Sequence, residues 1–142
     1  MQIKASRDFV RQRAQVLEKF RDPGRVEEVL ADMNVSARRT EGGPPPAWEC
    51  AIHWHEADRS FTARMEEPAP GETLLLSLAS DLGDAAITMD FQDRPEGGCR
   101  VTATSDLTAH TMLARLTLQS LRLVRGKGED RLTRLIAALG RP

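Results

Sequence analysis

The spacing of hydrophobic positions changes from strand-like to helical within the first third of the chain. Residues 2–9 alternate apolar and polar side chains, which predicts a short strand. Residues 13–21 carry apolar side chains one helical turn apart, which predicts a helix. Asp22 and Pro23 then predict the start of a second short helix, because Asp caps helices well and Pro needs no amide hydrogen in the first turn.

Between residues 34 and 108 the period is two, which predicts a series of strands. The loop 41–46 is rich in Gly and Pro, and Ala57-Asp58-Arg59 is predicted to be a tight turn. Because short turns join consecutive strands, we expect an antiparallel sheet with one face toward solvent. The predicted strands are 34–40, 48–55, 61–66, 74–80, 85–92 and 101–107.

The last segment, residues 109–139, predicts one long helix. Its apolar side chains between 112 and 124 cover about half of the helix circumference, with arginines on the opposite side. After Gly126-Lys127-Gly128 the apolar stripe shifts sideways. Glycine inside a helix costs about 1 kcal/mol relative to alanine, so we expect the helix to bend near Gly126.

The composition is that of an ordinary soluble domain. The 142 residues fit one domain spanning 1–142, with 40% hydrophobic and 29% charged residues and a net charge of −1, which gives no reason to expect nucleic-acid binding. No apolar run approaches the roughly 18 residues of a membrane helix, and residues 1–4 show no signal-peptide core. Cys50 and Cys99 are too few for a disulfide framework, so we expect a cytoplasmic protein.

The charge is unevenly distributed. Residues 1–39 carry nine basic and six acidic side chains, residues 40–108 carry four and thirteen, and residues 109–142 carry seven and two. The simplest interpretation is that basic helices pack on an acidic sheet. The alternative is a basic surface that makes peripheral contact with anionic lipid or binds an acidic partner. The pattern leaves open whether the protein is a monomer or a homodimer.

Several short motifs stand at fixed places in the predicted elements. They are Asp22-Pro23, Trp48 at the start of its strand, Ala114-Arg115-Leu116, Leu118-Gln119-Ser120-Leu121 and Val124-Arg125-Gly126. These motifs and the order of the predicted elements resemble the START-like, or SRPBCC, superfamily, and in particular a bacterial group within it. The resemblance covers the whole chain and implies an α+β helix-grip fold, in which a curved antiparallel sheet of about seven strands wraps around a long C-terminal helix. It also implies an apolar cavity between sheet and helix, which we expect the bend near Gly126 to open.

Side chains on the apolar phase of the strands and of the long helix are the candidates for lining this cavity, although a plain core would use the same positions. A lining of Met, Leu and Ile with only 4% aromatic residues in the chain suits a flexible aliphatic or isoprenoid ligand. The candidate ligand-binding residues are Trp48, Ile52, Trp54, Phe61, Met65, Leu76, Ile87, Met89, Phe91, Leu116, Thr117, Ser120 and Lys127.

Three of these candidates are polar and fall within the apolar half of the long helix. Thr117 and Ser120 can bond to the backbone carbonyl one turn back, and Lys127 can extend past the glycine pair to solvent. The functional alternative is that the three side chains orient the head group of a ligand.

We predict no catalytic residue, metal site or cofactor. His53 and His55 share one face of their strand, but this face is opposite to that of the tryptophans and points to solvent. Cys50 lies in apolar surroundings, which raise the pKa of a thiol and make it inert. The prolines of the loop 42–46 remove the amide donors that an anion would need.

These patterns predict a protein that binds a hydrophobic small molecule such as a lipid, a fatty acid or a quinone, and such binding can serve transport or sequestration. The alternatives are an enzyme of the polyketide cyclase/dehydrase type and a protein-interaction module with a vestigial cavity. An enzyme needs an ionisable pair inside the cavity and a carrier needs an open apolar cavity. An interaction module needs a filled core and a large exposed apolar patch.

Overall fold

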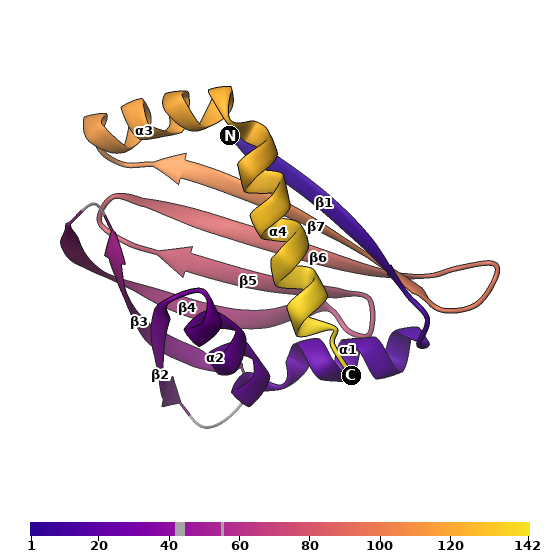
Figure 1. Ribbon diagram of the computed structural model, residues 1–142. Helices are drawn as coiled ribbons and strands as arrows, with labels where there is room; N and C mark the ends of the chain where they lie inside the picture. The colour runs from indigo at the N-terminus through magenta and orange to yellow at the C-terminus, as the bar shows by residue number, and fades with distance from the viewer. Residues whose placement is uncertain (42–44, 55) are drawn as a thin grey trace.

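A computed structural model describes the chain except for residues 42–44 and 55. The described residues form seven strands in one antiparallel sheet with the order β1-β7-β6-β5-β4-β3-β2, and four helices (Figure 1). The strands are β1 (Gln2–Phe9), β2 (Val35–Glu41), β3 (Ala47–Trp54), β4 (Ala57–Ala69), β5 (Thr73–Ala79), β6 (Gly83–Asp93) and β7 (Cys99–Ala109). The helices are α1 (Arg13–Arg21), α2 (Pro23–Asp32), α3 (Met112–Leu123) and α4 (Arg125–Leu139).

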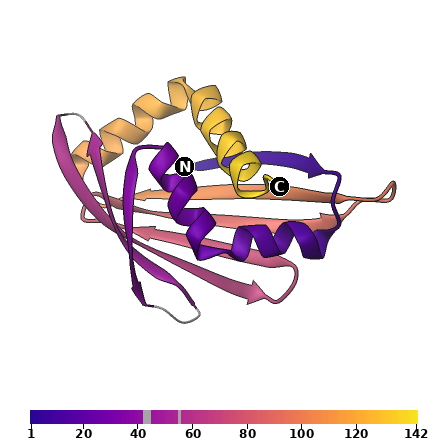
Figure 2. The ribbon, with the colours of Figure 1, turned by 60° about the horizontal axis from the view of Figure 1, so that its bottom comes forward.

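The expected α+β helix-grip architecture is confirmed. Strands β2 to β7 form a meander, and β1 closes the order by pairing with β7. The sheet curves without closing, and all four helices lie on one side of it (Figure 2). Helix α4 packs mainly against β1, and α2 packs against β2.

The core fills the space between the sheet and helices α1, α2 and α4. Phe20 of α1 is fully buried and makes edge-to-face contacts with Phe91 and Phe9, at ring-centroid distances of 5.0 and 6.2 Å. The apolar phase of the strands faces this core, as predicted. Helix α4 contributes four buried side chains, which are Leu132, Leu135, Ile136 and Leu139.

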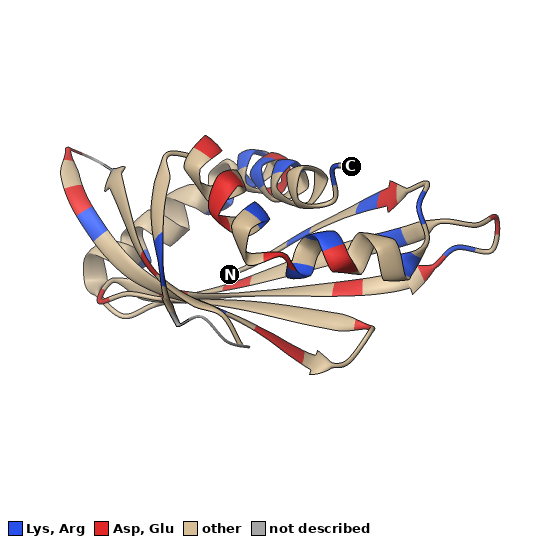
Figure 3. Ribbon diagram, turned by 90° about the horizontal axis from the view of Figure 1, so that it is seen from below, with Lys and Arg blue, Asp and Glu red and all other residues tan. Residues whose placement is uncertain are grey.

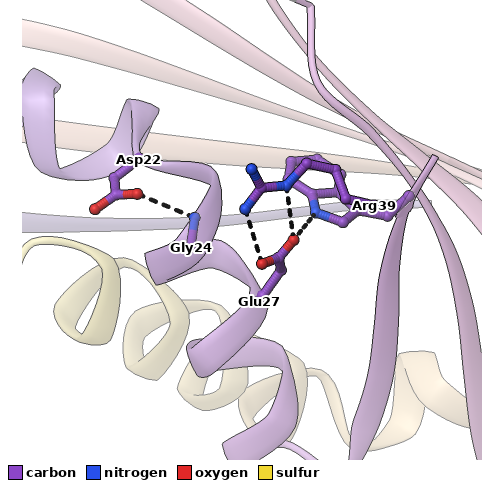
Figure 4. Close-up of polar contacts among 5 residues, drawn as sticks. Asp22, Gly24, Glu27 and Arg39 are labelled. Carbon is purple, nitrogen blue, oxygen red and sulfur yellow. Dashed lines mark hydrogen bonds and ion pairs between the residues drawn. The ribbon is translucent and has the colours of Figure 1, made fainter. Parts of the chain in front are cut away.

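Polar contacts hold α2 against the sheet (Figure 4). The Asp22 carboxylate caps α2 by accepting a hydrogen bond from the amide of Gly24, as its position before Pro23 predicted. The Glu27 carboxylate accepts two hydrogen bonds from the Arg39 guanidinium, at 2.9 and 3.0 Å, and one from the indole N–H of Trp48 at 3.0 Å. Trp48 is therefore buried as predicted, but the helix that binds it is α2 and not the C-terminal helix.

The tight turn predicted at residues 57–59 is wrong. The segment Ala57-Asp58-Arg59 is not a turn but the beginning of β4, because Ala57 already pairs in register with Trp54 of β3. Glu56, directly before this strand, has a φ of 60°. Because residues 57–59 belong to the strand, Arg59 lies on the inward phase of β4, which is also the phase of Phe61 and Met65.

The C-terminal helix is interrupted as expected, but at a different residue. Helix α3 ends and α4 begins at Val124, whose ψ of 37° departs from helical geometry, two residues before the predicted bend at Gly126. Gly126 and Gly128 both lie inside α4. A Cβ at Gly128 would stand 2.7 Å from Cδ1 of Ile3, so this glycine lets α4 approach β1 closely.

Candidate ligand groove under α3

An open groove of about 840 Å³ lies between α3 and the ends of the strands β3 to β7. In Figures 1 and 2, α3 extends away from α4 at an angle to it. The groove is lined by Ile52, Asp58, Arg59, Ser60, Phe61, Leu78, Ala79, Ser80, Asp81, Leu82, Gly83, Asp84, Ala85, Leu107, Thr108, Ala109, Leu113, Ala114, Thr117, Leu118 and Leu121.

The wall formed by the sheet is apolar at its centre. Leu78, Ala85 and Leu107 are direct register partners across the neighbouring strands β5, β6 and β7, so they form one continuous row. Phe61 and Ile52 extend the apolar wall on β4 and β3. Several residues that line the groove are small, among them Ala79, Gly83 and Ala85, and they leave room under the helix.

Helix α3 forms the opposite wall and makes few contacts with the rest of the protein, chiefly with β7 and α4. Thr111 caps its first turn by accepting a hydrogen bond from the amide of Ala114, at 3.1 Å. Of its residues Met112–Leu123, all of which the structure describes, none is buried. Because the groove separates α3 from the sheet, its inner leucines Leu113, Leu118 and Leu121 face the open groove.

The structure divides the predicted ligand-binding residues into three groups. Three line the groove: Ile52, Phe61 and Thr117. Six lie in the filled core: Trp48, Met65, Leu76, Ile87, Met89 and Phe91. Three are exposed and do not line the groove: Leu116, Ser120 and Lys127. The side chain of Trp54 lies outside the described part of the chain, as does residue His55.

The polar helix residues form the local contacts that their sequence context permits. Thr117 Oγ1 donates to the carbonyl of Leu113 at 2.9 Å, and Ser120 Oγ donates to the carbonyl of Leu116 at 3.2 Å. Such back-bonding satisfies a hydroxyl on a helix without any ligand. Among these residues, Thr117 is the one that reaches the groove.

Arg59 is the groove residue that the sequence interpretation missed. It is half-buried, lies on the inward phase of β4 and pairs in register with Ile52. Among the described residues that line the groove it is the only basic one. If the alternation of Phe61, Ala63 and Met65 is extended by two residues toward the N-terminus, it predicts that Arg59 faces inward.

Three carboxylates also line the groove, those of Asp58, Asp81 and Asp84. Asp58 is paired with Nδ1 of His53 and Asp84 with Nε2 of His110, both at 2.9 Å. His53 is exposed, as predicted.

The two cysteines are buried and free. Burial raises the pKa of the Cys50 thiol, and burial is also the largest cause of the raised pKa of Cys99. Within the part of the chain that the structure describes, no three His, Cys, Asp or Glu residues form a group that could hold a metal ion.

Similar folds occur in solved structures, although no family model and no curated protein matches the chain. TTHA0849 from Thermus thermophilus is 15% identical with a TM-score of 0.74, covering 99% of this chain and 94% of that chain. Truncated norcoclaurine synthase from Thalictrum flavum is 10% identical with a TM-score of 0.72, covering 99% and 91%. The ZhuI aromatase/cyclase from Streptomyces sp. R1128 is 13% identical with a TM-score of 0.67, covering 97% and 93%.

These structures show that the chain has the START-like, or SRPBCC-like, fold that its sequence resembles. In the described residues, no helix is long and apolar enough to cross a membrane.

Proposed function

We propose that the protein binds a hydrophobic small molecule in the groove under α3. The observation that carries the proposal is an apolar groove of about 840 Å³ roofed by a helix that buries none of its described side chains. Small-molecule sites in proteins typically have volumes of about 300–1,000 Å³ and mostly apolar walls. A ligand in the groove would bury the leucines that α3 leaves uncovered.

The lining favours an aliphatic ligand. Leucines come from both walls, Leu78 and Leu107 from the sheet and Leu113 and Leu118 from α3, and Phe61 is the aromatic side chain among the described lining residues. Flexible aliphatic chains adapt to such a surface, whereas a flat ring system gains most from aromatic partners. Of the predicted ligands, a fatty acid or a lipid with an aliphatic chain fits best.

Arg59 supports an acidic head group. Its guanidinium belongs to the inward phase of the sheet beside Ile52, so a carboxylate bound there would meet a positive charge at the apolar wall. An arginine can bind a carboxylate through two parallel hydrogen bonds. We therefore propose a fatty acid, with its chain along the leucines and its carboxylate toward Arg59.

A pair of tryptophan substitutions on α3 tests the groove. Ala114→Trp places an indole in the groove, whereas Gln119→Trp places the same side chain on the opposite, exposed side of the helix. Binding of a fluorescent fatty-acid analogue should weaken by about tenfold or more in the first variant, since the indole occupies the ligand volume, and stay unchanged in the second. Equal affinities in the two variants would contradict the proposal.

The enzyme alternative makes a different prediction. In it, Arg59 would act on a bound substrate, and an Arg59→Met variant would lose turnover of a polyketide-like substrate. The carrier predicts that the unmodified ligand is recovered after incubation with the protein, which mass spectrometry of the bound molecule measures. We further propose that the chain acts as one domain in the cytoplasm, which agrees with its two buried free thiols.

A further inference from the structure

Helix α3 has two apolar faces, and the proposed ligand accounts for one of them. Leu113, Thr117, Leu118 and Leu121 face the groove. On the far side of the helix lies a second set, Met112, Leu116 and Leu123, here called the outward stripe. These three side chains are 72%, 55% and 88% exposed, and none of them lines the groove.

Helix geometry places the outward stripe on one line. Residues 112, 116 and 123 project within about 40° of one another at 3.6 residues per turn. The groove-facing residues project to the opposite side. Three large apolar side chains on one exposed line are unlike the scattered single exposed hydrophobics of most surfaces.

Positive charge accompanies the outward stripe. Arg115 and Arg122 lie beside it on the helix surface, and Lys127 follows at the start of α4. Residues 109–128 contain four Lys and Arg side chains and no Asp or Glu. None of the ion pairs among the described residues involves Arg115, Arg122 or Lys127, so these charges are not neutralised within the protein.

Carboxylates flank the basic segment on two sides. Asp58, Asp81 and Asp84 line the groove from the side of the sheet, and Glu129 of α4 pairs with Arg125. In Figure 3, blue segments with some red ones between them follow α4 toward the C-terminus, and the strands carry segments of both colours. The outward side of α3 is therefore apolar and basic at once.

We propose that the outward stripe of α3 rests on the surface of an anionic lipid bilayer. A helix with large apolar side chains on one line and arginines beside them fits the interface, where apolar groups enter the acyl boundary and cations meet lipid phosphates. A second copy of the chain fits less well, because each partner of a stable protein interface buries about 800 Å², far more than three side chains cover. The contact is independent of the proposed ligand, since the two faces of α3 share no residue.

The test is co-sedimentation of the whole protein with vesicles of phosphatidylcholine, with and without phosphatidylserine. Each basic group near an anionic surface contributes about fivefold to binding. Arg115→Gln with Arg122→Gln should therefore weaken binding to the phosphatidylserine vesicles by about 25-fold. Leu116→Gln with Leu123→Gln should abolish it. These positions are exposed, so we expect the variants to fold.

Matched controls come from outside α3. Val10→Gln removes another exposed apolar side chain, and Arg131→Gln removes another exposed arginine; both should bind vesicles like the unaltered protein. Uptake of the fluorescent fatty acid from solution should be unchanged in the Leu116→Gln, Leu123→Gln variant, so failure of the membrane contact is distinguishable from failure of the ligand groove.

Three results would overturn the membrane contact. The first is equal binding to both kinds of vesicle, and the second is vesicle binding that survives loss of the outward stripe. The third is a dimer, measured by light scattering, that the Leu116→Gln, Leu123→Gln variant converts to a monomer while no vesicle binding occurs. That result would assign the stripe to a second copy of the chain.

Discussion

Helices α3 and α4 follow one another directly along the chain, yet they relate to the sheet in opposite ways. Helix α4 buries Leu132, Leu135, Ile136 and Leu139, whereas α3, which is described over its full length, buries none of its side chains. Both helices are amphipathic. An apolar helix face therefore indicates a partner, and the surface beneath the helix decides whether that partner is the protein's own core.

The surfaces beneath the two helices explain the difference. Under α4, Gly128 admits Ile3 at close range and the fully buried Phe20 and Phe91 fill the core nearby. Under α3, the strand ends carry small side chains such as Ala79, Ala85 and Ala109, which leave the groove open.

The largest effect that we expect is a difference in the free energy of unfolding between substitutions in α4 and substitutions in α3. Ile136→Ala in α4 removes a fully buried side chain and should lower the free energy of unfolding by about 2–5 kcal/mol. Leu123→Ala in α3 removes one that is 88% exposed and should change it by less than about 0.5 kcal/mol. Urea unfolding measures both. Similar losses in the two variants would mean that α3 is part of the core.

The glycines of α4 allow a sharper version of the same comparison. Gly128→Val should destabilise by about 1–3 kcal/mol, because its side chain would overlap Ile3. At Gly126 an added Cβ meets no atom within 4 Å, so Gly126→Ala should stabilise α4 by up to about 1 kcal/mol. If thermal unfolding gave both variants the same stability, the close approach of α4 to β1 would be wrong.

The sequence predicted the filled core under α4, the closed part of the molecule, better than the groove under α3, the open part. Period-two alternation identified the inward side chains, such as Met65 and Met89, because one face of each strand is buried and the register follows. The groove could not be predicted, because helical periodicity reports which side of α3 is apolar and not the size of the side chains opposite. Arg59 was missed through the misplaced turn, and Leu116 was assigned to the cavity because α3 is apolar on two sides.

Arg59 should decide which ligands the open part prefers. In Arg59→Met the affinity for a fatty acid should fall by about tenfold, because the charge partner of the carboxylate is lost. The affinity for the corresponding methyl ester should not change, and Arg59→Lys should restore part of the preference. Competition against the fluorescent analogue gives the ratio of the two affinities within each variant, which removes any effect on folding. A ratio that does not depend on residue 59 would exclude Arg59 from the site.

The smallest effect that we expect is on the pH dependence of stability, through Glu27 of α2. The Arg39 guanidinium, together with the Trp48 indole, holds the pKa of Glu27 below its ordinary value. A carboxyl with a lowered folded-state pKa stabilises the protein above its unfolded pKa, and this contribution is lost as the pH falls through the folded pKa. Glu27→Gln should therefore lower stability by about 1 kcal/mol near neutral pH and flatten the acid side of the stability profile. An unchanged profile would show that the Glu27 contacts add nothing.

The most direct test of the central claim is a methyl NMR titration with a long-chain fatty acid. We expect shifts in the methyl signals of Leu78, Leu107 and Leu118, which line the groove, while those of Leu74 and Leu139 in the filled core stay in place. Shifts confined to the core leucines, or the absence of any saturable shift in the groove, would contradict the assignment of the ligand site to the space under α3.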